Sequence, residues 1–140
     1  MQRLFQGLRV LHASISYGVA TVNNVNGLVL LPDDWIQPSD LIFTSCGSSD
    51  YNARDYKMNN YTVSDWEKME TNGAVFLPAA GIRGSNGNIV YGSEGYYWSS
   101  TIQATGYSYD LFFNSHGVFL RGGDYHRPYG QSVRLVRDVE

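Results

Sequence analysis

The sequence predicts a single α+β domain over residues 1–140, and three observations lead to that fold class. Residues 62–72 have the capped, amphipathic pattern of a helix. Residues 109–121 alternate in character around a turn, as an antiparallel hairpin does. Several short apolar runs end in Gly, Pro or Asn, as strands between long loops do. One helix among several strands is typical of an α+β domain, with its sheet near the C-terminal half.

The composition bounds the size and the partners of this domain. The chain has 140 residues, among them eleven Tyr, six Phe and three Trp, and can bury one core. Its formal net charge of −3, without a basic cluster, argues against nucleic acid and anionic membrane as main partners. No apolar run approaches the roughly 18 residues of a membrane-spanning helix, so we expect no membrane insertion. The single cysteine, Cys46, excludes an intrachain disulfide and a cysteine metal site.

The first residues have basic positions but are broken by polar ones, so we do not expect them to form a signal peptide. We expect either that the protein is not exported by that route or that another segment carries the signal.

The N-terminal third predicts strands separated by turns. Residues 1–22 are ambiguous, and their apolar positions suit an edge or terminal strand with an irregular continuation. A turn cluster at residues 23–27 leads into an apolar run at 28–31, which predicts a buried strand stopped by Pro32. Asp33 and Asp34 then either ligate a metal or, more simply, make a turn or cap a helical turn.

The best helix begins after Thr62, which suits an N-cap, with Asp65 three residues later in a variant of the capping box. Asn72-Gly73 closes the helix. The face predicted to pack inward carries Val63, Trp66 and Met69.

The segments flanking this helix predict loops and further strands. Residues 37–60 are polar and rich in turn formers, which indicates a long loop. Residues 74–81 predict a buried strand bending at Pro78. The glycines at 81, 84 and 87 are turn residues, because a phosphate loop needs a lysine and a following helix. Residues 96–100 predict a central strand, and 132–136 a last strand with Val133 and Leu135 inward.

The organising stretch of the chain is residues 95–137, which contains the hairpin. Its alternation predicts a register of four opposed pairs: Phe113 with Val118, Phe112 with Phe119, Leu111 with Leu120, and Asp110 with Arg121. One face of the hairpin is then wholly apolar. The other face, predicted to meet solvent, carries an aromatic pair beside an acid–base pair.

The residue types of this stretch point to recognition. Between Ser99 and Gly130 there is no Lys, Glu, Met or Trp and only one Gln. Tyr, Ser, Gly, Asn, Asp, His, Phe and Arg dominate instead, as in antibody-like paratopes. The alternative is a hairpin rich in Tyr and Gly whose role is stability alone.

No motif predicts catalysis. The acidic residues form no pair with the context of glycoside hydrolysis, and no nucleophile elbow is present. His116 and His126 lack a metal-ligand spacing. We therefore expect no enzymatic activity, no cofactor and no metal.

Five segments resemble a known family: residues 27–35, 61–70, 73–81, 97–101 and 130–136. They are similar to the C-terminal domains of Bacteroidetes major-paralogous-domain proteins, and equally to the variable proteins of diversity-generating retroelements. The resemblance covers about residues 4–137, and the combination of FLPAAG, YWSST and GxSVRLV is specific. It implies a C-type-lectin-like fold of small twisted antiparallel sheets, one or two helices and long loops. That fold is distantly related to the formylglycine-generating enzyme, whose active-site cysteines Cys46 alone does not supply, and calcium-lectin motifs are absent.

In retroelement variable proteins, adenine-directed mutagenesis of asparagine codons varies the surface residues on a constant scaffold. Such codons cannot become those of Lys, Glu, Gln, Met or Trp, which matches the types scarce here; Gln103 fits less well. The resemblance makes residues 97–136 the candidate variable region. The scaffold it implies consists of Tyr109, Leu111, Phe113, Ser115, Val118, Arg127, Gly130 and residues 132–136. The variable positions it implies include Gly117, Gly122 and Gly123 beside most of the candidate ligand-binding residues. Those candidates are Tyr107, Asp110, Phe112, Asn114, His116, Phe119, Arg121, Asp124, Tyr125, His126 and Tyr129.

These observations predict a non-enzymatic binding domain, displayed on a bacterial surface or a phage tail, which recognises a protein or glycan on a target cell; a homo-oligomer is compatible with this role. The expected anchors are Phe112, Phe119, Tyr125 and Tyr129. The polar residues expected to orient the ligand are Asp110, Arg121, Asp124 and Arg127. The alternative is a pilin-type or fibre subunit whose exposed aromatic residues form an assembly interface.

Overall fold

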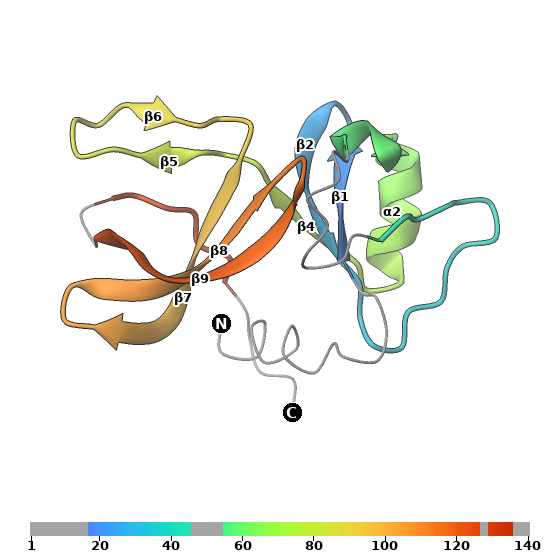
Figure 1. Cartoon of the computed structure of the whole chain (residues 1–140). Coiled ribbons are helices and arrows are strands. Elements are labelled where there is room, and N and C mark those ends of the chain that lie inside the picture. Colours follow the sequence, from blue (N-terminus) through green and yellow to red (C-terminus); the bar gives the residue numbers. More distant parts are fainter. Residues whose placement is uncertain (1–16, 46–54, 127–128, 136–140) are drawn as a thin grey trace.

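The computed structural model describes residues 17–45, 55–126 and 129–135. Their elements are β1 (Tyr17–Val22), β2 (Val25–Leu30), the 3-10 helix η1 (Tyr56–Met58), β3 (Asn60–Tyr61), α2 (Val63–Thr71), β4 (Val75–Pro78), β5 (Ile82–Arg83), β6 (Ile89–Val90), β7 (Gly95–Ala104), β8 (Tyr107–Asn114) and β9 (Gly117–His126). Figure 1 shows two halves side by side: β1–β4 with α2, and β5–β9.

The prediction of an α+β domain is wrong, because the described residues are mainly β. They form nine strands in three sheets and one α-helix of nine residues. Segments predicted as loops or turns supply the short strands β3 and β5, and β6 lies where no element was predicted. β3 pairs with β1, and β5 pairs with β6. The C-type-lectin-like arrangement implied by the resemblance stays a prediction.

The first sheet has the order β3-β1-β2-β4. Asn23 and Asn24 connect β1 to β2, with φ values of 48° and 64°. Positive φ at both central residues gives a turn whose twist matches that of a hairpin, and asparagine tolerates it. The turn is therefore shorter than predicted, and β2 begins at Val25. β1 is interior, between β3 and β2, so the prediction of an edge or terminal strand is wrong for residues 17–22; residues 1–16 lie outside the described part.

Helix α2 confirms the predicted capping box. The backbone N–H of Asp65 donates to Thr62 Oγ1 over 3.2 Å, and the N–H of Thr62 donates to Asp65 Oδ2 over 3.0 Å. Both bonds satisfy donors that a helix start leaves open. Met69 is buried and Trp66 half-buried, but Val63 is 51% exposed, so its predicted inward position is wrong. In the first turn of the helix, only a side chain that points toward the sheet is buried.

The main core lies between the first sheet and the sheet β7-β8-β9. Alternate residues of β1 and β2 face the two sides of their sheet. Val19 and Leu28 meet Leu111 and Phe113 of β8, while the opposite face packs against α2 through a second cluster that includes Met69. The first sheet therefore lies between the sheet β7-β8-β9 on one side and α2 on the other.

The third sheet, β7-β8-β9, has β8 in its centre. The prediction of a central strand at residues 96–100 is therefore wrong in position, although a strand is there. On the side of β7 away from β8, the described residues form only isolated bridges, from Tyr97 to Ser132 and from Gly95 to Gly81.

The C-terminal segment differs from the predicted last strand. It contains isolated bridges rather than a strand, and Val133 and Leu135 are exposed, Leu135 by 87%. Gly130 exchanges two backbone hydrogen bonds with Arg83, of 2.7 and 2.8 Å, and Ser132 bonds to Trp98 and Tyr96 of β7. These bonds use the backbone of residues 130–132 to join β5 to β7, and beyond Ser132 no described strand continues the pairing.

Candidate ligand-binding site

The predicted hairpin is present with the predicted register. β8 and β9 pair antiparallel, and all four predicted pairs stand opposite each other, from Asp110 with Arg121 to Phe113 with Val118. The turn Asn114–Gly117 closes the hairpin, where the backbone N–H of His116 donates to Asn114 Oδ1 over 2.9 Å. Side-chain alternation was therefore sufficient to fix which residues share each face.

One face of this hairpin packs as expected into the main core, through Leu111, Phe113 and Val118. The other face does not meet solvent as predicted. Phe112 is only 5% exposed and forms a third, smaller core cluster with Ile82 and Tyr96. The β5–β6 hairpin and residues 129–132 lie over this face, so this face of the β8–β9 hairpin is covered as well. The predictions that Phe112 is a solvent-facing anchor, or an exposed contact in an assembly interface, are therefore wrong.

Asp110 is also inside the protein, with 2% exposure. Its Oδ2 accepts a hydrogen bond of 3.2 Å from Gln131 Nε2, which ties β8 to the C-terminal segment. A buried carboxylate needs such partners, because burial without them is costly. We interpret this carboxylate as a positioning group for the segment around Gln131.

The other candidate residues divide by exposure. His116 is exposed, and Tyr107, Asn114, Phe119 and Tyr129 are half-buried. The backbone places Arg121 opposite Asp110 and His126 opposite Tyr107 in β9. The side chains of Arg121, Asp124, Tyr125 and His126 lie outside the described residues, as does Arg127, and with them the predicted acid–base pair.

Four aromatic rings form a continuous series across this half of the molecule, which we call the aromatic row: Tyr91, Tyr96, Phe112 and Phe119. Successive ring centroids are 6.4, 4.9 and 5.6 Å apart. These separations are those of favourable aromatic pairs. Tyr129 packs against the same cluster. The interior of the row is buried, while Tyr91 at one end is 60% exposed and Phe119 at the other is half-buried.

Tyr91 was not among the predicted site residues, yet it has the most unusual backbone of the row. Its φ is 54°, a left-handed conformation that a bulky side chain rarely adopts. The carbonyl of Tyr91 accepts a hydrogen bond of 2.9 Å from the N–H of Glu94, which closes the turn into β7. Backbone strain of this kind costs about 1–3 kcal/mol and is concentrated at functional sites. In the sequence, the only indication was the uncharged apolar run Ile89-Val90-Tyr91 before Gly92.

Hydrogen bonds fix Tyr96 of the aromatic row and its neighbour Tyr97 in β7. Tyr96 donates its hydroxyl proton to Glu94 Oε2 over 2.5 Å. On the opposite side of β7, Tyr97 donates to the carbonyl of Pro78 over 2.8 Å and joins this sheet to the first one. Burial raises the pKa of Tyr97, so its hydroxyl remains a donor well into the alkaline range.

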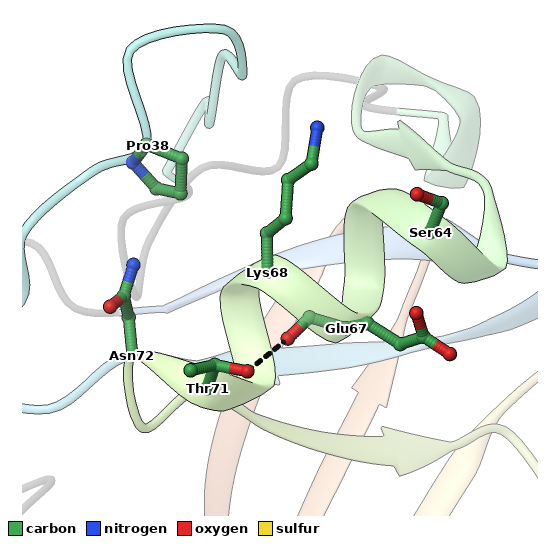
Figure 2. A pocket seen from close by; sticks show the side chains of 6 residues that line it. All are labelled: Pro38, Ser64, Glu67, Lys68, Thr71 and Asn72. Carbon is green, nitrogen blue, oxygen red and sulfur yellow. Dashed lines mark hydrogen bonds between the residues drawn. The ribbon is translucent and has the colours of Figure 1, made fainter.

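A separate depression lies on the exposed side of α2 (Figure 2), with a volume of about 460 Å³. It is lined by Pro38, Ser64, Glu67, Lys68, Thr71 and Asn72. Lys68 Nζ lies 2.5 Å from Asp40 Oδ2, and this hydrogen bond lowers the pKa of Asp40 and raises that of Lys68. None of the predicted site residues is at this depression, and its open form carries no argument for a ligand.

In residues 17–45, 55–126 and 129–135, no three His, Cys, Asp or Glu side chains gather in a group that could hold a metal ion. No helix in this part of the chain has both the length and the apolar character needed to cross a membrane.

The fold and site together define a mainly β domain with an aromatic row on a sheet that is covered on both faces. The chain belongs to the family described as Domain of unknown function (DUF8237), which matches residues 52–136. This match includes α2 and all strands from β3 to β9, and so the whole aromatic row. Comparison with curated proteins and with solved structures gives no match.

Proposed function

We propose that this domain binds a protein or glycan target, without catalysis, through the surface at the accessible ends of the aromatic row. The contact residues are Tyr91, Phe119 and Tyr129, with His116 and Tyr107 nearer the ends of the hairpin. The observation that carries the proposal is Tyr91: a strained, exposed tyrosine whose ring continues a buried aromatic series. Exposed aromatic residues backed by a packed cluster are typical of binding hot spots.

The buried part of the row supports recognition by making its exposed ends rigid. Phe112 and Tyr96 pack between the sheet and the β5–β6 hairpin, so they hold the accessible rings without touching a ligand. Rigid aromatic residues bind with little loss of side-chain entropy. In this proposal Asp110 and Phe112 therefore belong to the scaffold, and ligand contacts come from the rim.

The resemblance to variable proteins of diversity-generating retroelements supports the same class of function. In that reading, display on a bacterial surface or a phage tail follows, and β8 and β9 with their turn carry the varied positions. The matching composition of residues 99–130 is independent of any side-chain position, so it remains an argument for this origin.

The experiment replaces Tyr91 with glycine. Glycine adopts the left-handed conformation without strain, so relief of strain offsets the lost ring contact with Tyr96, which is worth about 0.5–1.5 kcal/mol. We expect the free energy of unfolding to change by less than about 1 kcal/mol. Binding should weaken at least about tenfold, as for a hot-spot aromatic residue.

The probes are an oligosaccharide array and a displayed random-peptide library, followed by titration of the best binder from each. The array and the library separate a glycan target from a protein target. Tyr109→Ala is the matched control, since Tyr109 is exposed on β8 but points to the face opposite the row. Absence of binding to both probe sets, or equal weakening by both substitutions, contradicts the proposal.

A further inference from the structure

The β5–β6 hairpin has an open edge, and this edge is uncharged. β5 is bonded on one side to β6 and on the other to Gly130. Among the described residues, β6 pairs with β5 alone, and Figure 1 shows β6 as the outer strand of this hairpin, away from β7–β9. From Ser85 to Ser93 the chain has no charged residue. Natural proteins usually protect such edges with charges or proline, because an open edge is a template for another strand.

The register determines which backbone groups lie on that edge. Gly84 donates its N–H to the carbonyl of Asn88 over 2.9 Å, and Arg83 directs its own N–H and carbonyl to Gly130. Since backbone groups alternate in direction along a strand, the pair of Arg83 and Ile89 is the one without mutual hydrogen bonds. The N–H and carbonyl of Ile89 therefore point away from β5, toward the open edge.

The side chains at this edge are apolar and accessible. Ile89 is 69% exposed, and Val90 is partly exposed beside the buried Ile82. Tyr91, in its left-handed conformation, ends the strand immediately afterwards. The edge therefore offers another strand the N–H and the carbonyl of Ile89, together with the exposed side chain of the same residue.

We propose that a second copy of this chain occupies the edge, through antiparallel pairing of β6 with β6 about a two-fold axis at Ile89. An edge that presents one donor, one acceptor and one apolar side chain at a single residue is complementary to itself, as a two-fold interface must be. Each Ile89 donates its N–H to the carbonyl of its mate, and the two isoleucine side chains meet on one face. No like charges oppose each other across the axis, although each copy has a net charge of −3.

This dimer is weak and depends on concentration. Three residues of each copy, Asn88–Val90, bury much less than the roughly 800 Å² per partner of a stable interface. The two hairpins join into one four-stranded sheet, β5-β6-β6-β5, and Tyr91 of each copy lies two residues from the axis, at the border of the interface. Sedimentation measures the dimer and titration measures ligand binding, so each proposal can fail without the other.

Sedimentation velocity over a concentration series up to the millimolar range tests the proposal. We expect a monomer at low concentration and a dimer at high concentration. Ile89→Pro removes the outward N–H but none of the bonds between β5 and β6, because proline is tolerated on an edge. It should raise the dissociation constant at least about tenfold while the melting temperature stays within a few degrees. Ile89→Lys should also weaken the dimer. Its control is Ile102→Lys, at an exposed isoleucine of β7, which should leave the dimer intact.

Cross-linking tests the register itself. In the Cys46→Ser background, which has no other thiol, Ile89→Cys places two cysteines opposite each other with Cα atoms about 5.5 Å apart, within the span of a disulfide. Mild oxidation should give a covalent dimer at least about tenfold faster than for Ile102→Cys, through a higher local thiol concentration. A protein that stays monomeric, or a dimer that survives Ile89→Pro and cross-links equally at both positions, overturns the proposal. The edge then has another occupant, or none.

Discussion

At the residue scale, Asn59 joins three segments of the chain. It is buried, and its side-chain N–H groups donate to the carbonyls of Val19 and Thr44 over 2.9 and 2.6 Å. Its Oδ1 accepts from the N–H of Thr44 over 2.7 Å. The amide therefore takes the place of a strand partner between Thr44 and β1, in addition to the packing of Leu41 and Phe43 against the core.

We predict that Asn59→Ala lowers the free energy of unfolding by about 2–3 kcal/mol, because it leaves backbone groups of Val19 and Thr44 without their partner. Urea unfolding followed by circular dichroism measures this value. Asn60→Ala is the matched control, at the exposed neighbouring asparagine, and should cost less than about 0.5 kcal/mol. Equal losses in the two variants would show that the Asn59 amide contributes nothing specific.

The site residues show what a single sequence reveals at this scale. Phe112 and Phe119 were correctly assigned to one face, but alternation cannot say what covers that face. The cover comes from Ile82 and from Tyr129, which lie far away in the sequence. The run Leu111-Phe112-Phe113 was the available signal, since continuous apolar runs are typical of strands buried on both faces. The strained backbone of Tyr91 has no such signal, because φ at a tyrosine follows from the turn geometry around it.

At the scale of elements, local rules predicted what depends on neighbours in the chain. The capping box of α2 and the register of β8 with β9 follow from residues within a few positions of each other. The two-residue strands β3, β5 and β6 were missed, because so short a run has no period. Their existence depends on partners such as β1 and Gly130. The mainly β class follows from the long strands β7, β8 and β9 beside one described α-helix of nine residues.

The pairing of β7 with β8 depends on a glycine. Gly95 stands opposite Phe113, and a Cβ atom at Gly95 would lie 2.0 Å from two ring atoms of Phe113. Phe113 is fully buried in the main core, so its ring cannot turn out into solvent without leaving that core. The cross-strand glycine thus provides the space in which this ring packs.

We predict that Gly95→Ala destabilises the fold by about 2–3 kcal/mol or more through overpacking. Gly92→Ala is the control: no atom lies within 4 Å of its added Cβ, so its effect should stay below about 0.5 kcal/mol. The double variant Gly95→Ala/Phe113→Leu should lose less than the sum of the two single variants, since the smaller side chain relieves the overlap. Additive losses in thermal or urea unfolding would contradict this explanation.

At the scale of the whole molecule, tyrosine hydroxyls connect the layers. Tyr56 donates to the carbonyl of Ser93 over 2.7 Å, and Tyr61 donates to that of Ile42 over 2.6 Å. With the bond from Tyr97 to Pro78, they link η1 to the segment before β7, β3 to the loop at Ile42, and β7 to β4 of the first sheet. The sequence shows many tyrosines, but the layers they join are set by contacts between distant segments. For that reason the stacking could not be predicted.

These tyrosines make the folded state sensitive to alkaline pH. Burial raises the pKa of Tyr61 from 10.0 to about 12, and it also raises the pKa values of Tyr56 and Tyr97. Above pH 10.0 the unfolded chain loses these protons while the folded chain keeps them. The folded state then binds more protons than the unfolded state, so stability decreases as pH rises. The stabilisation is complete below pH 10.0 and is lost progressively toward pH 12 and above.

We predict that the melting temperature falls steeply from about pH 10 upward, as each such tyrosine lowers the free energy of unfolding by about 1.4 kcal/mol per pH unit. Circular dichroism melts give the stability, and tyrosinate absorbance gives the titration. Tyr61→Phe should cost about 1 kcal/mol at neutral pH through its lost hydrogen bond, yet show a shallower decline above pH 10. Lys68→Gln separates the contribution of the Lys68–Asp40 pair, whose raised lysine pKa acts in the same direction. A slope identical in wild type and Tyr61→Phe would assign the alkaline loss to groups other than the tyrosines that join the layers.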